Sequence, residues 1–404
     1  MRAFRTLSPW VLSTTLLLAA CGGSDPDVPG SGSPSGAPTA PGSFSAVVSF
    51  GDSLSDVGSY APATSLAGNG SAPYFGGRFT TNDTTTGAPT ATPLGKVWVE
   101  NLAASLGLVV TPAEAGFGST SVKCPAAAVP ALATTCTAYG QGGARVTDPI
   151  GIGHSIGALT VPVVTQVANH LTRFSSFKNS DLILVYAGNN DVFIQFDAFA
   201  AAAAQIQANA AAGLITPDRA NLELFNAQQV AQAAMKTAAQ ELVALIKAQI
   251  LAKGGTYVGV MTLSDIADTP FGNSPQVAPA RSVLSALSDT YNLWLRDGLT
   301  GQPVQIIDTW ALYKEVYTNP AKYGIVNNTT PACDPAKILT VTGGAVADGS
   351  SLFCNATPGA PYNTLATGAD ANTWQFADGV HPTTGGHRNI SDAFAAQLRA
   401  FGWI

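Results

Sequence analysis

The sequence is poor in charge and has no basic stretch. Only 11% of its 404 residues are charged, compared with about 25% in an average protein, and the net charge is −6. Hydrophobic residues make up 46% of the chain, which excludes a disordered polyelectrolyte and a long coiled coil. Because the sequence has no basic stripe, the protein offers no electrostatic site for the phosphate backbone of a nucleic acid. We therefore expect a globular protein, monomeric, with no nucleic-acid partner.

Long hydrophobic runs are also lacking. The one run near the N-terminus, residues 10–20, is too short to span a bilayer comfortably and follows Arg2 and Arg5, as in a signal peptide. Its end, Leu18-Ala19-Ala20-Cys21, resembles the lipobox of bacterial lipoproteins, in which the cysteine is lipidated. The alternative is an ordinary cleavable signal. We expect residues 1–21 to direct export and Cys21 to anchor the protein to the outer membrane, on its periplasmic or cell-surface face, unless the protein is released.

The segment that follows the signal has few residues able to form a core. Of residues 22–43, 16 are Gly, Ser or Pro, a composition that predicts a flexible tether. No second linker and no internal repeat is found after it. We therefore expect one domain over residues 44–404, with long insertions. The alanine-rich stretch 197–252 is the candidate for a helical lid, and two helices that simply pack on the core are the alternative.

Cysteine is scarce, with only four residues after Cys21. They are Cys124, Cys136, Cys333 and Cys354, and an even number in an exported chain suggests disulfides. Three pairings are possible, and proximity in sequence favours Cys124 with Cys136 and Cys333 with Cys354. A zinc site is disfavoured, because neither pair has the C-x₂₋₄-C spacing and no histidine lies nearby. We expect no metal and no cofactor.

Short apolar runs alternate with helical patterns along the domain. Continuous apolar runs at 46–50, 181–186, 256–260 and 304–308 predict buried parallel strands. Apolar residues at spacings of three and four predict helices over 97–106, 161–174, 197–252, 280–295 and 383–401. This alternation is typical of an α/β fold, a three-layer α/β/α open sandwich with a mainly parallel sheet.

A serine follows the first predicted strand directly. In Phe50-Gly51-Asp52-Ser53-Leu54-Ser55-Asp56, Ser53 lies just past the carboxyl end of a strand, where α/β sheets bind their ligands. This heptapeptide resembles the first block of the GDSL, or SGNH, hydrolases. In these esterases and lipases the corresponding serine is acylated. The resemblance implies a flavodoxin-like sheet and a substrate that is a small-molecule or lipid ester.

Three further blocks of that family occur in the expected order. The stretch at 139–145 resembles the second block, whose glycine donates a backbone N–H to the oxyanion hole, so that Gly143 is expected there. Ala138 replaces the usual Asn, which leaves Gly142 open as the alternative. Gly188-Asn189-Asn190-Asp191 is similar to the third block and implies Asn190 as a side-chain donor. Asp378-Gly379-Val380-His381-Pro382 is similar to the last block.

These residue types fit acyl transfer. A serine hydroxyl becomes a good nucleophile when an imidazole accepts its proton, and a carboxylate orients that imidazole. Ser53, His381 and Asp378 are expected in these roles, with the oxyanion held by Ser53, Gly143 and Asn190. The sequence thus predicts a serine carboxylester hydrolase. An acyltransferase that uses the same acyl-enzyme, and a catalytically silent binding protein on the same fold, are the alternatives.

Other polar and aromatic residues are further candidates for roles in the site. Ser155 lies in a G-x-S-x-G pattern, but Pro and Gly precede it where that nucleophile elbow needs a strand. Asp52 and Asp191 are expected to hold turns through backbone hydrogen bonds. For Trp98, lining of an acyl pocket and core packing remain open. Surface or capping roles are expected for the remaining histidines, His154, His170 and His387.

Overall fold

A parallel sheet forms the centre of the fold. The structure is a computed structural model that describes residues 32–66, 77–83, 95–359 and 363–404. Four strands have the order β1-β4-β5-β6, and all three pairs are parallel. Their bounds are Ala46–Gly51 (β1), Asp181–Tyr186 (β4), Tyr257–Met261 (β5) and Gln305–Ile307 (β6). They match the four predicted runs closely, because β1, β4 and most of β5 are buried on both faces, as strands of an α/β sheet are.

A short segment extends the sheet beyond β1. The backbone N–H of Ser49 donates to Thr137 O at 3.0 Å, and that of Tyr139 donates to Ser49 O at 2.8 Å. Ala138 forms a parallel bridge to Ser49 between these two bonds. The chain that follows this segment therefore leaves the sheet at the same edge as the chain that follows β1.

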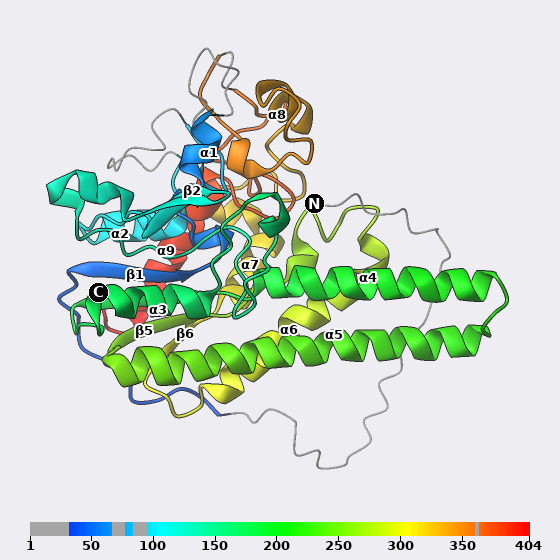
Figure 1. The fold of residues 1–404 in the computed structure, drawn as a ribbon, viewed down its shortest axis with the longest axis horizontal. Helices are drawn as coiled ribbons and strands as arrows, with labels where there is room; N and C mark the ends of the chain where they lie inside the picture. Colours follow the sequence, from blue (N-terminus) through cyan, green and yellow to red (C-terminus); the bar gives the residue numbers. More distant parts are fainter. Residues whose placement is uncertain (1–31, 67–76, 84–94, 360–362) are drawn as a thin grey trace.

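Helices cover both faces of the sheet (Figure 1). The helices α3 (Val163–Phe174), α4 (Asn189–Ala211), α5 (Pro217–Leu245) and α6 (Arg281–Gly298) connect strands that advance in one direction across the sheet. Right-handed crossovers place such helices on one face. On the other face α2 (Trp98–Ser105) packs against α9 (Thr384–Ala400). This arrangement is the expected three-layer α/β/α sandwich.

Smaller elements surround these layers. The helices α1 (Ala61–Leu66), α7 (Thr309–Thr318) and α8 (Pro335–Val341) were not predicted from sequence. The strands β2 (Glu114–Phe117) and β3 (Thr120–Lys123) form a separate antiparallel hairpin. Among the described residues, no helix combines the length and the apolar character that crossing a membrane requires.

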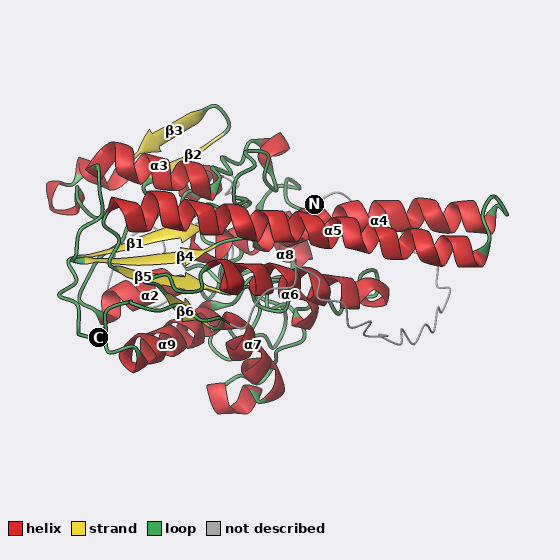
Figure 2. Cartoon of the chain, turned by 90° about the horizontal axis from the view of Figure 1, so that it is seen from below, coloured by secondary structure: helices red, strands yellow, loops and turns green. Residues whose placement is uncertain are grey.

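The helices α4 and α5 form a long hairpin that extends beyond the body (Figure 2). The half of α5 near the body is buried through Ala231, Met235, Ala239 and Leu242, and it packs on α6. The outer half of the hairpin exposes large apolar side chains, namely Leu214 in the loop between the two helices and Leu222, Phe225 and Val230 of α5. The stretch 197–252 is therefore helical as predicted, although α4 begins earlier, at Asn189. Its action as a lid stays a prediction.

The end of the expected tether is bonded to the body. Gly301 N–H donates to Ser33 O at 3.0 Å, and Ser35 N–H donates to Gln302 O at the same distance. Further along, Gly42 N–H donates to Trp403 O at 2.9 Å. The prediction of a free tether over 22–43 is therefore wrong for residues 33–42, because backbone groups rather than apolar side chains hold them, which composition does not reveal. Residues 1–31, including Cys21, lie outside the described residues.

Both cysteine pairs favoured by proximity form disulfides. Cys124 and Cys136 are bonded, and so are Cys333 and Cys354, with Cα atoms 5.3 and 5.9 Å apart. The second pair lies in a small core of its own with Ala332, Ile338 and Leu365. This small core supports the loop that contains Asp378.

Candidate active site

Ser53 lies in a tight turn at the carboxyl end of β1. Gly51 ends the strand, and a Cβ atom there would lie 2.2 Å from Tyr186 O of the neighbouring strand, so only glycine fits. Asp52 then caps a short 3₁₀ helix, Ser53–Ser55, by accepting a hydrogen bond from Leu54 N–H at 3.1 Å. The turn leaves the Ser53 side chain 8% exposed at the edge of the sheet.

His381 brings the far end of the chain to this turn. Its Nε2 lies 2.8 Å from Ser53 Oγ, and its Nδ1 lies 2.8 Å from Asp378 Oδ2. With Nδ1 facing a carboxylate, the neutral imidazole carries its proton on Nδ1, so Nε2 is free to accept the hydroxyl proton. The structure thus brings together the three side chains that the sequence motifs singled out.

Asp378 is held by backbone groups as well as by the imidazole. Its Oδ1 accepts hydrogen bonds from Val380 N–H and His381 N–H, and its Oδ2 accepts one from Ser351 N–H at 2.9 Å. Burial alone would raise the pKa of Asp378, but His381 and these hydrogen bonds hold the pKa below its usual value. The carboxyl group is therefore ionised at neutral pH and can stabilise a positive charge on His381.

The second block supplies one backbone donor, and the structure favours Gly143 over Gly142. Gly142 N–H already donates to Asp56 Oδ2 at 2.9 Å. The described residues offer no hydrogen-bond partner to Gly143 N–H. Gly143 has a φ of +78°, and a Cβ atom there would lie 2.0 Å from Ile152 O, which accounts for the glycine. Gly143 therefore stays the predicted oxyanion donor despite the departure from the family pattern at Ala138.

Asn190 lies in the first turn of α4, at the carboxyl end of β4. Its Nδ2 donates one hydrogen to Ala144 O at 2.8 Å, which fixes the amide and leaves its second hydrogen free to donate. Since β1, β4 and the segment at Ala138 end at the same edge of the sheet, Ser53, Asn190 and Gly143 converge there. The positive end of the α4 dipole also points to this edge and favours negative charge.

Two aspartates next to motif residues hold the site's loops, as expected. Asp52 Oδ2 accepts a hydrogen bond from Asn189 Nδ2 at 3.0 Å, and burial raises the pKa of Asp52 to about 6. Asp191 accepts hydrogen bonds from Arg145 Nε and Val146 N–H, which joins α4 to the second block. Burial raises the pKa of Asp191 although Arg145 opposes the shift.

Sequence reasoning missed two polar residues that support the site. Asp56 is fully buried and accepts hydrogen bonds from Gly58 N–H, Ser59 N–H, Ser59 Oγ and Gly142 N–H. Gln166 of α3 binds both backbone groups of Gly51. Asp56 belongs to the first block, so its place in the motif was a usable signal. Gln166 lies more than a hundred residues from Ser53, and no local pattern marks it.

The other candidates from the sequence fall outside the site. Ser155 is exposed on a short 3₁₀ helix, and His154 beside it is also exposed. Trp98 is buried in the core against Phe394, which decides against an acyl pocket there. His170 is buried among aromatic rings such as Phe177, so the expected surface or capping role is wrong for it. His387 is also buried, but its Nδ1 accepts a hydrogen bond from Trp98 N–H at the start of α2, which is the capping role.

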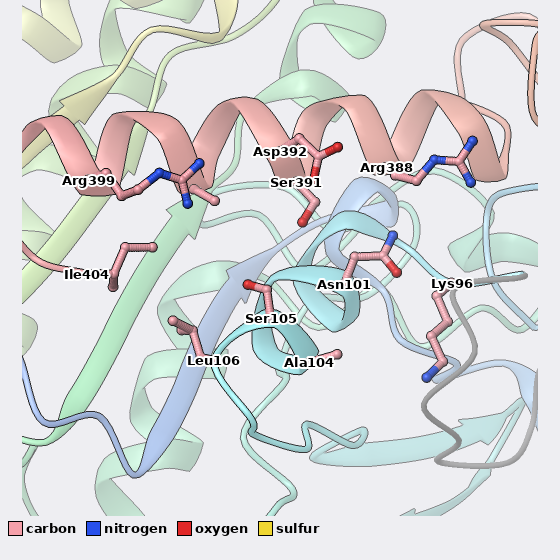
Figure 3. Close-up of a pocket in the computed structure, with 11 residues that line it drawn as sticks. Lys96, Asn101, Ala104, Ser105, Leu106, Arg388, Ser391, Asp392, Arg399 and Ile404 are labelled. Carbon is pink, nitrogen blue, oxygen red and sulfur yellow. The ribbon is translucent and has the colours of Figure 1, made fainter. Parts of the chain in front are cut away.

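A pocket of about 470 Å³ lies between α2 and α9, away from the Ser53 turn (Figure 3). Its lining combines Lys96, Arg388 and Arg399 with Asp392, and it includes no residue of the Ser53, His381 and Asp378 group. Within the described ranges, no group of three or more His, Cys, Asp or Glu side chains is placed to hold a metal ion.

Comparison with known proteins supports the motif assignment. A search of curated proteins finds no match. The model of the GDSL-like lipase/acylhydrolase family, however, matches residues 47–394, which include every block described above. The chain therefore belongs to the GDSL-like lipase/acylhydrolase family, whose activity is of the hydrolase or esterase type.

Proposed function

We propose that the protein is an exported carboxylic-ester hydrolase that uses Ser53 as nucleophile, His381 as general base and Asp378 as the group that orients it. The observation that carries this proposal is the 2.8 Å contact between Ser53 Oγ and His381 Nε2, made by residues 328 positions apart. Such a contact between distant residues, completed by an ionised carboxylate, is the arrangement that activates a serine hydroxyl.

In the first step, Ser53 Oγ attacks the ester carbonyl carbon while His381 Nε2 takes the hydroxyl proton. The carbonyl oxygen becomes negatively charged and faces Ser53 N–H, Gly143 N–H and the free hydrogen of Asn190 Nδ2. One such preorganised donor is worth about 2.7–4 kcal/mol in the transition state. His381 then protonates the leaving alcohol, and the acyl group remains on Ser53.

In the second step, a water molecule replaces the alcohol. His381 Nε2 takes a proton from the water, whose oxygen attacks the acyl carbon, and the same three donors hold the oxyanion again. Collapse of this intermediate breaks the bond to Ser53 Oγ, and His381 returns the proton to the serine. The products are a carboxylic acid and the regenerated hydroxyl group, and no cofactor is consumed.

The test is hydrolysis of p-nitrophenyl butyrate by the body that begins at residue 32. The wild type should turn over, and Ser53→Ala should lower kcat by at least about 10⁴-fold. Ser155→Ala is the matched control, because Ser155 is an exposed serine in the rival motif, and it should retain full activity. Retained activity in Ser53→Ala, or a wild type without turnover, would refute the proposal.

We also propose that export ends in lipid attachment at Cys21. The charged and apolar start of the chain and the Leu18-Ala19-Ala20-Cys21 tetrapeptide support this, and two disulfides fit an oxidising compartment. Labelled palmitate should be incorporated into the full chain expressed in a Gram-negative host, and Cys21→Ser should abolish the label. Equal labelling of both forms, or of neither, would contradict lipidation.

A further inference from the structure

The short segment of residues 77–82 lies beside the site and forms many hydrogen bonds and one ion pair with the body. Residues 77–82 contain no helix or strand of the sheet, yet Arg78 forms a buried two-point ion pair with Glu100, through Nε at 2.7 Å and Nη2 at 2.8 Å. Asn82 Nδ2 donates to Ser351 O and Cys354 O, and Asn82 N–H also donates to Cys354 O. These contacts fix both ends of the segment.

The middle of the segment is fixed as well. Thr81 Oγ1 accepts a hydrogen bond from Thr384 N–H, and the carbonyl oxygen of Thr81 accepts one from the Thr384 hydroxyl group. The carbonyl oxygen of Phe79 accepts a hydrogen bond from His387 Nε2 at 3.2 Å, because His387 Nδ1 accepts one from Trp98 N–H. Burial lowers the pKa of His387 to about 3, so this imidazole stays neutral and its two hydrogen bonds persist at physiological pH.

All this anchoring holds one half-exposed ring in place. In residues 77–82 only the Phe79 side chain is not buried, and its ring centroid lies 4.8 Å from that of His381, tilted by 35°. The same ring occupies the space in front of Gly142, where a Cβ atom would lie 2.3 Å from Phe79 Cε2 and Cζ. The ring therefore fills the gap between the imidazole and the second block.

This contact adds to the restraint that the hydrogen bonds impose on His381. The bonds at Nδ1 and Nε2 lie in the plane of the imidazole, which is joined to the chain through Cβ, and tilting of the ring out of that plane is opposed by groups that touch its faces. An aromatic ring packed on one face provides that opposition. The same ring supports Gly142, whose peptide bond to Gly143 carries the expected oxyanion donor.

We propose that Phe79 is a positioning residue for ester hydrolysis, which holds the His381 imidazole toward Ser53 and the Gly142–Gly143 peptide toward the oxyanion. The proposal rests on the proposed function. In this proposal, the anchored segment 77–82 holds the Phe79 ring in its position against His381 and Gly142. Because the ring acts on groups that serve every substrate, its removal should slow turnover equally for all of them.

The experiment compares Phe79→Ala and Phe79→Leu on p-nitrophenyl acetate, butyrate and octanoate. Misplacement of a reacting group by about 1 Å costs up to about 100-fold, so kcat of Phe79→Ala should fall roughly 10- to 100-fold by the same factor on all three esters. KM should change less than about threefold, and Phe79→Leu, which restores apolar cover, should recover most of kcat. Phe44→Ala is the matched control, since Phe44 is also half-buried against one ring, Tyr257, but at the opposite edge of the sheet.

A double-mutant cycle with Gly142→Ala keeps the test decisive if Phe79→Ala folds poorly. The new methyl group would lie 2.3 Å from the Phe79 ring and 2.9 Å from Tyr60 Cε2, so Gly142→Ala should lower kcat in the wild type, and Phe79→Leu or Phe79→Ala should relieve the part of that loss that comes from the Phe79 ring. Additive losses, an unchanged kcat, or a defect confined to KM that grows with chain length would overturn the inference. If the same preparations hydrolyse the esters and Ser53→Ala abolishes this activity, the proposed function holds even where the inference about Phe79 fails.

Discussion

The two sides of the site shift the pKa values of their buried carboxyl groups in opposite directions. On the side of Ser53 and the oxyanion donors, burial raises the pKa values of Asp52, Asp56 and Asp191. On the side of the base, the pKa of Asp378 is lowered despite its burial, because His381 and backbone N–H groups favour the charged form. On one side, aspartates thus hold loops by accepting backbone N–H groups. On the other side, Asp378 also stays ionised next to His381.

The two sides also differ in what fixes them. Ser53 and Asn190 follow regular strands, and the neighbouring turns are bound by carboxylates that accept backbone N–H groups. Asp378 and His381 lie in the loop that precedes α9, after the 3₁₀ helix Ser351–Phe353. This loop is held by the Cys333–Cys354 disulfide and by backbone bonds such as Cys333 N–H to Ala377 O. Loss of a carboxylate should therefore act differently on each side.

The largest effect is expected on the side of the base. Asp378→Asn replaces an ionised acceptor with an amide, which no longer fixes the proton on His381 Nδ1 and stops stabilising the imidazolium. The kcat for p-nitrophenyl butyrate should fall by about 10⁴-fold at pH 7, while the fold is retained by circular dichroism. A loss below tenfold would mean that the carboxylate does not serve the base, and the contrast between the two sides would disappear.

A smaller but still large effect is expected on the oxyanion side. Asp56→Asn places an amide hydrogen against Gly142 N–H, so the loop that carries Gly143 must move. The kcat should fall by about 10²–10³-fold, the size of effect that loss of one oxyanion donor has. Asp334→Asn is the control, because Asp334 also accepts backbone N–H groups but caps α8, where asparagine serves equally well. Equal activity of the two variants would show that Asp56 does not position the donor.

The disulfides separate stability from activity. Their loops are similar in size, with sequence separations of 12 and 21, so each should contribute about 3 kcal/mol to the free energy of unfolding. Removal of Cys333–Cys354 by paired alanines should also lower kcat, by roughly tenfold, because Ser351 N–H and Ala377 lose their support around Asp378. Removal of Cys124–Cys136 should lower only thermal stability. Matching kcat values for the two double variants would rule out a link between the disulfide and the base.

The smallest effect on turnover is expected at Asp52, where the pH dependence of stability should change instead. Its pKa rises from 3.8 to about 6 on folding, so the folded state binds this proton more tightly than the unfolded state. Stability from this group is present at low pH and is lost as the pH rises from about 4 to about 6. Asp52→Asn should therefore gain up to about 3 kcal/mol over the wild type between about pH 4 and pH 7, in denaturant titrations. An advantage that does not grow with pH would show that Asp52 is not protonated more readily in the folded state.

The sequence was most informative where function and local structure coincide. Strand ends followed by Gly51-Asp52-Ser53 and by Gly188-Asn189-Asn190 are local patterns, and the sheet could be predicted from such strands. The meeting of Ser53 with His381 could be predicted from the resemblance of Asp378–Pro382 to the last block of the family. Phe79 could not be found in this way, because its role depends on Glu100, Thr384 and His387, which tertiary folding brings together. The choice between Gly142 and Gly143 likewise required the position of Asp56.

The bonded segment 33–42 lies at one end of the parallel strands. Residues 33–42 contact Gln302, just before β6, as well as Tyr257 at the start of β5 and Trp403. All of these contacts lie at the amino-terminal ends of the strands, whereas Ser53 lies at the carboxyl-terminal ends. In the described part of the chain, the N-terminal segment therefore lies on the side of the molecule opposite the Ser53 hydroxyl group.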